Sequence, residues 1–96
     1  MYVVTVIFKI ESEFSEQFLN RVKQQAKDSI NNESECHVFD VCVNPEQSDS
    51  VFLYEVYSDR SAFDTHLNSA HFLSFDQESR DWVASKHVNT FLKIQT

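Results

Sequence analysis

The chain has 96 residues, a net charge of −7 and no glycine. This length predicts one domain, residues 1–96, that buries only about 60–65% of the surface its unfolded chain exposes. The acidic balance argues against nucleic acid or an anionic membrane as a partner, because binding to phosphates relies on Lys and Arg. The lack of glycine excludes a P-loop and a dinucleotide-binding turn, which both need glycine where the backbone meets phosphate.

The first ten residues are apolar, but they are too few to span a membrane. They also lack the basic start and the small-residue cleavage site of a signal peptide. The only cysteines, Cys36 and Cys42, fall on one predicted strand, roughly 20 Å apart. A disulfide needs a Cα separation of about 4.4–6.8 Å, so we expect two reduced, buried thiols and a cytoplasmic location.

The first two predicted elements are a strand and a long helix. Both alternating sets of side chains in Tyr2–Ile10 are largely apolar, which predicts a central strand covered on both faces. A helix should begin at Ser12 or Glu13 and end near Asn31. Its apolar stripe repeats every fourth residue, through Phe14, Phe18, Val22, Ala26 and Ile30.

Two further strands, two helices and a last strand follow. The pattern predicts a hairpin of Cys36–Val43 and Val51–Ser58 around a loop that contains Pro45. Short helices should follow Ser58 and Ser69, and Lys86–Gln95 should close the chain as a strand.

This order is the split βαβ, ferredoxin-like arrangement, an α+β fold whose antiparallel sheet carries its helices on one face. Because the strands are apolar on both faces, the bare face of the sheet needs a cover. We therefore expect a homodimer in which two sheets pack together, as in a dimeric α/β barrel.

Two carboxylates, Asp40 and Glu55, stand where a strand would normally carry Val or Ile. A buried carboxylate costs free energy unless it is paired or hydrogen-bonded. One hairpin register places Asp40 opposite Glu55, and a shift by one residue places Phe39 there instead. Adjacent carboxylates would raise one pKa and provide a general acid or base. Alternatively, Glu55 pairs with a basic side chain and Asp40 lies at the rim.

A tyrosine and a histidine extend this candidate site. Tyr57 shares the face of Glu55, and His66 falls on the inward face of the following helix, where an imidazole can exchange protons. The alternative for His66 is a core histidine bonded to a carbonyl group. His71 follows five residues later, a spacing that does not align two side chains on one helix face, so we expect no metal site. Trp82 is expected in the core or in a pocket wall.

Several short motifs, taken in order and spacing, resemble the antibiotic biosynthesis monooxygenase family of small dimeric ferredoxin-like proteins. They are Cys36 at the start of a strand, Asn44-Pro45, Phe52-Leu53-Tyr54-Glu55-Val56-Tyr57, Ala62-Phe63-x-x-His66 and Ser69-x-His71-Phe72. The resemblance covers nearly the whole chain. It implies an enzyme that uses no cofactor.

Within this family, Phe39-Asp40-Val41 and the Glu55 strand most resemble the subgroup with the isomerase of phosphorylated autoinducer-2. This resemblance implies catalytic roles for Asp40, Glu55, Tyr57 and His66 around a small carbonyl-bearing substrate. Lys27 stands where the isomerase has a histidine, and a lysine there would act as a cation for phosphate or enolate. The further substrate contacts we expect are Phe39, Phe72 and Trp82.

These observations predict an enzyme that removes a proton from a quinol-like or dicarbonyl compound. The resulting anion either reacts with oxygen, as in a monooxygenase, or is reprotonated elsewhere, as in an isomerase. A non-catalytic dimeric module that binds a small molecule is the third alternative. The haem-degrading branch of the fold is not expected, because it uses an asparagine in the first strand, which offers Ile7 instead.

Overall fold

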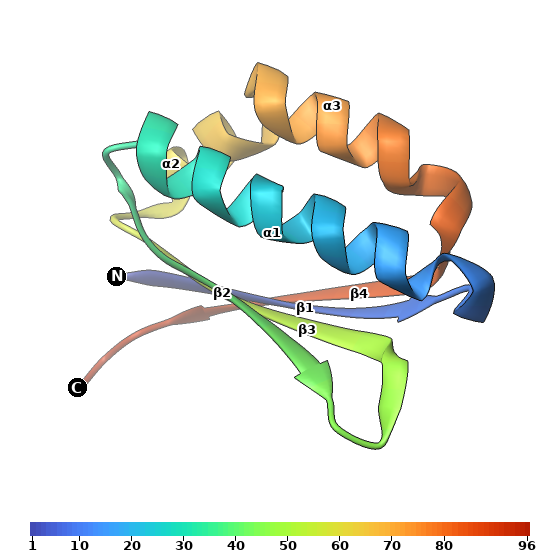
Figure 1. Cartoon of the computed structure of the whole chain (residues 1–96). Coiled ribbons are helices and arrows are strands. Elements are labelled where there is room, and N and C mark those ends of the chain that lie inside the picture. Colours follow the sequence, from blue (N-terminus) through green and yellow to red (C-terminus); the bar gives the residue numbers. More distant parts are fainter.

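The computed structural model describes residues 1–96 as one layer of sheet and one layer of helices (Figure 1). The elements in chain order are β1 (Tyr2–Ile10), η1 (Ser12–Phe14), α1 (Ser15–Asn32), β2 (Cys36–Asn44), β3 (Gln47–Tyr57), α2 (Arg60–Leu67), α3 (Ala70–Ser79), η2 (Arg80–Trp82) and β4 (Val83–Leu92).

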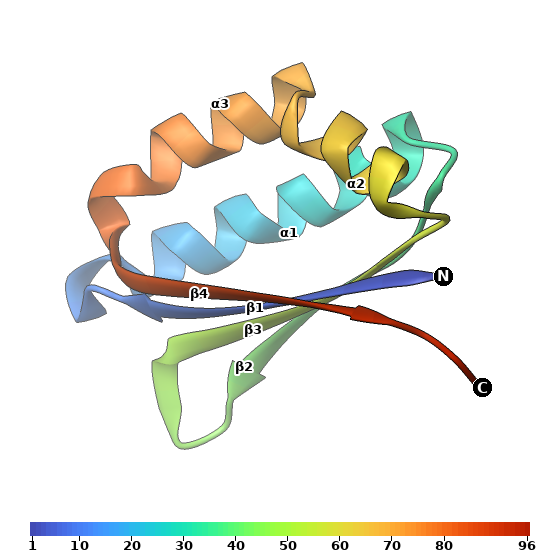
Figure 2. The ribbon, with the colours of Figure 1, turned by 180° about the vertical axis from the view of Figure 1, so that it is seen from behind.

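The sheet has the strand order β2-β3-β1-β4, and each neighbouring pair is antiparallel. All three α-helices lie on the same face of this sheet, which is plain from the front and from behind (Figures 1 and 2). The predicted α+β, ferredoxin-like fold is therefore confirmed, with β1 as a central strand. None of the helices combines the length and the apolar character needed to cross a membrane.

Helix α1 follows the predicted stripe only through its first half. Phe18 and Val22 are fully buried, and the Phe18 ring packs 4.9 Å from that of Phe8 on β1. Farther along, the buried positions become Gln25 and Ser29. A helix repeats every 3.6 residues, so a stripe with a strict spacing of four drifts around the axis. The prediction was therefore wrong for the end of the stripe, where two polar side chains enter the interior.

The hairpin connection is shorter than predicted. Strand β3 begins at Gln47, so only Pro45 and Glu46 lie between it and β2. The Asn44 Oδ1 atom accepts a hydrogen bond from the Glu46 N–H at 2.9 Å, a local contact typical of asparagine in turns. Residues 47–50, which are polar and were predicted to lie in the loop, therefore belong to strand β3.

A sharp break separates α2 from α3 and determines where the histidines lie. The Ser69 hydroxyl donates to the carbonyl of His66 at 2.7 Å and accepts from the Phe72 N–H at 3.2 Å. Ser69 thus caps the start of α3 in the manner typical of serine. His66 and His71 consequently belong to two different helices.

The face of the sheet that carries no helices, here called the open face, displays the second set of strand side chains. Ile7, Phe52 and Phe91 are exposed on it, with Ile7 at 46% and Phe91 at 55%. Cys42 is exposed there as well, so the prediction of two buried thiols holds only for Cys36. The predicted homodimer would cover these apolar side chains of the open face. The homodimer itself stays a prediction.

Candidate active site

The hairpin register separates Asp40 from Glu55. Phe39 lies opposite Glu55 on the helix side, and Asp40 lies opposite Tyr54 on the open face. An irregularity between Cys36 and Val38 sets this register, and a shift of one residue turns a side chain to the other face. Asp40 is exposed, so its predicted place beside Glu55 was wrong.

Glu55 is a buried carboxyl group in the middle of the sheet. It lies opposite Val4 of β1, is 3% exposed, and accepts a hydrogen bond from the Tyr57 hydroxyl at 2.5 Å. Burial raises the pKa of Glu55 to about 7, although the Tyr57 hydrogen bond and the Lys86 ammonium favour the charged form. A carboxyl group with this pKa can both donate and accept a proton near neutral pH.

His66 is the second buried titratable group, and a carboxylate orients it. Its Nδ1 atom lies 2.8 Å from Glu33 Oε2, so the ring donates there and leaves the Nε2 lone pair for another partner. Burial lowers the pKa of His66, and this effect outweighs the opposing effect of Glu33. The lowered pKa favours the neutral ring. Phe39 and Phe72 flank the ring, with centroid distances of 6.0 and 5.0 Å.

Glu55 and His66 line the same small cavity, of about 40 Å³, between the sheet and helices α2 and α3. Lys86 of β4 is the third polar residue in its wall. The remaining wall is apolar and consists of Val4, Val6, Phe63, Leu67, Phe72 and Val88. The structure therefore brings together Glu55, Tyr57 and His66, as the sequence predicted, and places Lys86 beside them as the cation.

Lys86 replaces Lys27 as the cation beside the candidate site. Lys27 lies on the exposed side of α1 and does not line the cavity, so its predicted place beside the site was wrong. The Lys86 ammonium lies 5.6 Å from the ring centroids of both Phe8 and Phe72. Strand alternation places Lys86 on the face of Val88, which was the signal available in the sequence.

Of the three predicted aromatic substrate contacts, two lie against His66. These are Phe39 and Phe72, and Phe72 also lines the cavity. Trp82 lies in η2 instead, where its ring stacks on Phe14 at 6.3 Å. It packs against the hydrophobic core, one of its two expected places, and does not line the cavity.

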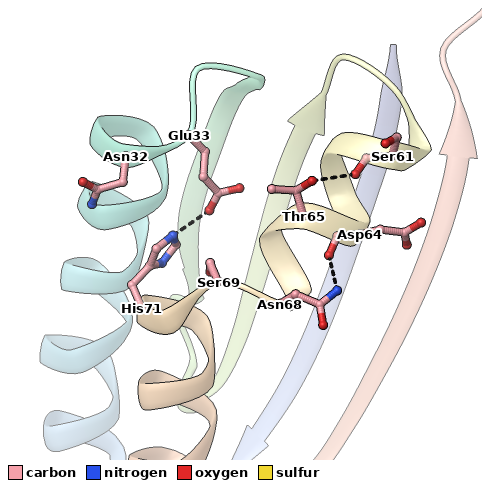
Figure 3. Close-up of a pocket in the computed structure, with 8 residues that line it drawn as sticks. All are labelled: Asn32, Glu33, Ser61, Asp64, Thr65, Asn68, Ser69 and His71. Atoms are coloured by element: carbon pink, nitrogen blue, oxygen red, sulfur yellow. Dashed lines mark hydrogen bonds and ion pairs between the residues drawn. The ribbon is translucent and has the colours of Figure 1, made fainter.

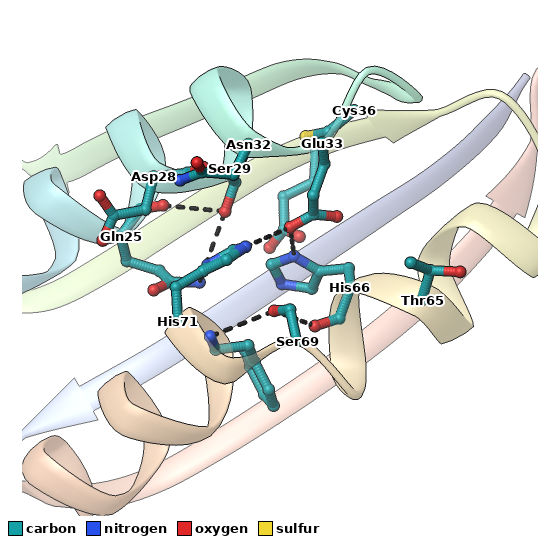
Figure 4. Close-up of polar contacts among 12 residues, drawn as sticks. Gln25, Asp28, Ser29, Asn32, Glu33, Cys36, Thr65, His66, Ser69 and His71 are labelled. Atoms are coloured by element: carbon teal, nitrogen blue, oxygen red, sulfur yellow. Dashed lines mark hydrogen bonds and ion pairs between the residues drawn. The ribbon is translucent and has the colours of Figure 1, made fainter.

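Glu33 links the buried site to an open pocket on the outside of the helical layer. Its Oε2 atom also lies 2.7 Å from the Nε2 atom of His71 (Figures 3 and 4). The outer pocket, about 620 Å³, has only polar lining residues: Asn32, Glu33, Ser61, Asp64, Thr65, Asn68, Ser69 and His71. Sequence reasoning missed Glu33, because a carboxylate just beyond a helix end carries no periodic signal.

The family model for antibiotic biosynthesis monooxygenase matches residues 1–78. The chain therefore belongs to the antibiotic biosynthesis monooxygenase family. Among curated proteins, none matches the sequence.

Solved structures share the fold at low sequence identity. A candidate antibiotic biosynthesis monooxygenase from Nitrosomonas europaea superposes with a TM-score of 0.94 at 24% identity, over 99% of this chain and 100% of the other. One from Bacteroides thetaiotaomicron gives a TM-score of 0.92 at 20% identity, over 98% and 90% of the two chains. At these identities the likeness establishes the architecture, and the chemistry must be argued from the site.

Proposed function

We propose that this protein is a cofactor-independent enzyme that removes a proton from a small quinol-like or dicarbonyl compound. The observation that carries the proposal is the shared cavity of Glu55 and the Glu33-oriented His66. Two buried titratable groups with opposite pKa shifts are typical of acid and base pairs in active sites. Membership of a family named for monooxygenases agrees with this assignment.

In the first step the His66 Nε2 lone pair accepts the proton. Glu33 holds Nδ1, so the ring keeps its orientation and the imidazolium that forms is stabilised by the carboxylate. The enolate or phenolate left on the substrate carries negative charge, and the Lys86 ammonium in the cavity wall is the group that stabilises it.

The second step decides between the two enzymatic alternatives. In a monooxygenase, the anion reduces dioxygen: a substrate CH₂ group becomes C=O, and the second oxygen atom leaves as water. In an isomerase, protonated Glu55 returns a proton to a different carbon, and no electrons leave the substrate. Glu55 suits this role because its pKa of about 7 leaves a substantial protonated fraction at neutral pH.

A second candidate is a module that binds a small molecule without turnover, and the small size of the cavity constrains both candidates alike. The cavity volume of about 40 Å³ is only slightly larger than the volume of one molecule in liquid water, about 30 Å³. A substrate therefore needs to displace part of the wall. Lys86 and Leu67 are exposed lining residues on whose displacement this depends, with Leu67 at 37%.

Proton removal is tested directly by exchange of carbon-bound hydrogen for deuterium. The protein is incubated in D₂O with a panel of quinols, diones and phosphorylated diones, and exchange is followed by NMR while oxygen uptake is measured in parallel. We expect His66→Asn to lower the exchange rate by about 10²–10⁴-fold, the usual contribution of a general base. Asp40→Asn, on the open face, is the matched control and should leave the rate unchanged.

Each outcome of this experiment separates the candidates. Exchange with oxygen uptake identifies a monooxygenase, and exchange with a rearranged product identifies an isomerase. Saturable binding of a panel compound without exchange identifies the binding module. Full exchange in both His66→Asn and Glu55→Gln overturns the proposed site.

A further inference from the structure

We propose that Glu33, His66 and His71 form a binding site for one divalent transition-metal ion such as Zn²⁺. This site lies on the Glu33 side of His66, and its existence can be tested without the proposed reaction, although the two share His66 and Glu33. Two imidazoles and one carboxylate are a ligand set that such ions prefer.

The three side chains converge although they come from three segments of the chain. Glu33 follows the last residue of α1, His66 belongs to α2, and His71 lies in the first turn of α3 (Figure 4). One ligand atom from each residue lies within 4.8 Å of the others. The sequence argument against a metal assumed one continuous helix, and the break at Ser69 removes that assumption.

The contact between His71 and Glu33 is short but poorly directed. The Nε2 atom of His71 lies 2.7 Å from Glu33 Oε2, yet it is buried and has no hydrogen bond of acceptable geometry. A buried ring nitrogen without an aligned partner is costly. A metal ion, which binds a nitrogen lone pair rather than a proton, would satisfy it.

The other nitrogen of His71 has a partner suited to a metal-bound ring. Its Nδ1 atom lies 3.2 Å from the side-chain amide of Gln25, a residue that is 1% exposed and whose Oε1 atom has no hydrogen-bond partner. Rotation of the amide by half a turn places Oε1 against Nδ1. His71 then donates from Nδ1 and presents an unprotonated Nε2, the arrangement that supports metal-ligating histidines.

An ion has a route to the site and groups to complete its coordination. Glu33 and His71 line the open outer pocket, which gives an ion an approach to the buried ligand atoms (Figure 3). Water from this pocket supplies the fourth position that a three-ligand zinc site leaves free. The C-terminal end of α1, an 18-residue helix, lies directly before Glu33, and its dipole favours a cation there.

Metal binding requires a small rearrangement of Glu33. The carboxylate oxygen now lies between the two rings, at 2.8 and 2.7 Å from their nitrogens. The ion would replace the proton between His66 and Glu33 and would bind each of the three ligand atoms at about 2.0–2.2 Å. Rotation of the Glu33 side chain toward the outer pocket makes room for it.

One consequence rests on the proposed function. An ion on His66 Nδ1 moves the ring proton to Nε2, which then becomes a donor and can no longer accept a proton from a substrate. Zinc is therefore expected to inhibit proton removal in the exchange assay.

The site itself is tested without any substrate, by titrating the intact protein with Zn²⁺ in a calorimeter and with Co²⁺ in a spectrophotometer. We expect one ion per chain and a cobalt spectrum of tetrahedral or five-coordinate type. His71→Asn should weaken the affinity at least about tenfold, and Glu33→Gln provides a second variant if His71→Asn fails to fold. His87→Asn, which alters a histidine on the open face, is the matched control and should bind normally.

Absence of stoichiometric binding overturns the proposal, and so does equal binding by the native protein and both site variants. Loss of binding in the His87→Asn control also overturns it, because the ion would then lie elsewhere. Because these readouts need no turnover, failure of the metal site and failure of the proposed reaction are seen in different experiments.

Discussion

The two faces of the sheet are built from the same strands, yet they differ in what they hold. The helix side contains the hydrophobic core and the two buried titratable groups of the cavity, Glu55 and His66. The open face presents Ile7, Phe52 and Phe91 to solvent, with Asp40 beside them. One residue of strand register separates these environments, so neighbouring residues on one strand serve different purposes.

This contrast shows where polar groups are tolerated and what they cost. On the helix side, the carboxyl group of Glu55 is buried, so its pKa rises and Tyr57 donates a hydrogen bond to it. On the open face, the carboxylate of Asp40 is solvated and needs no partner. The proposed chemistry therefore lies on the covered face, and the open face is the surface available to the predicted homodimer.

The largest expected difference between the faces concerns stability. Leu53 is buried against the helices, and its neighbour Phe52 points to the open face. Leu53→Ala should lower the free energy of unfolding by about 2–5 kcal/mol, because it leaves a cavity in the core. Phe52→Ala should cost less than about 1 kcal/mol when chemical denaturation is measured on dilute protein. Equal losses for the two variants would contradict the assignment of the faces.

The next effect is a dependence of stability on pH that comes from Glu55. Its folded pKa of about 7 lies above the value of 4.5 for a free glutamate, so this group stabilises the fold below pH 4.5. That contribution is lost as the pH rises toward 7, by roughly 3 kcal/mol in total. The pKa of His66 is lowered from its ordinary value of 6.5. His66 therefore destabilises the fold as the pH falls below 6.5, which opposes the effect of Glu55.

The variant Glu55→Gln separates the two contributions, because it keeps an acceptor for Tyr57 and removes the titration. The stability difference between the native protein and this variant should change between pH 4.5 and 7, as measured by urea denaturation at each pH. A difference that stays constant over this range would show that Glu55 ionises in the fold as it does in water.

Association should break when charge enters the open face. Ile7→Asp places a carboxylate at the centre of the predicted sheet-to-sheet interface, and by symmetry the change occurs twice in a dimer. We expect dimer dissociation to increase at least about thirtyfold, or about 2 kcal/mol, in sedimentation experiments. Leu73→Asp, at an exposed position on α3, introduces the same charge as a control. If the native protein is a stable monomer at micromolar concentration, the predicted sheet-to-sheet homodimer is wrong.

The fold was predictable from the sequence because periodicity reports burial. The alternation in Tyr2–Ile10 identified a central strand, and the spacing of the early α1 stripe located its buried side. The site was predictable only in part. Glu55, Tyr57 and His66 follow from strand and helix periods, but the register that excludes Asp40 depends on an irregularity in β2. Glu33 and His71 meet through loop geometry, which no sequence period encodes.

The smallest effect compares two tyrosines of β3, one on each face. Tyr57→Phe removes the only side chain that donates to buried Glu55, so it should cost about 1–3 kcal/mol in the free energy of unfolding. It should also raise the pKa of Glu55 further, because the hydrogen bond from Tyr57 favours the charged carboxylate. Carbon-detected NMR of the Glu55 carboxyl group across a pH titration measures this shift. Tyr54→Phe, on the open face, should change stability by less than about 0.5 kcal/mol and leave the Glu55 titration unaltered. If the pKa of Glu55 does not respond to Tyr57→Phe, the Tyr57 hydroxyl does not control the ionisation of this carboxyl group. The contrast between the two faces would then not extend to their tyrosines.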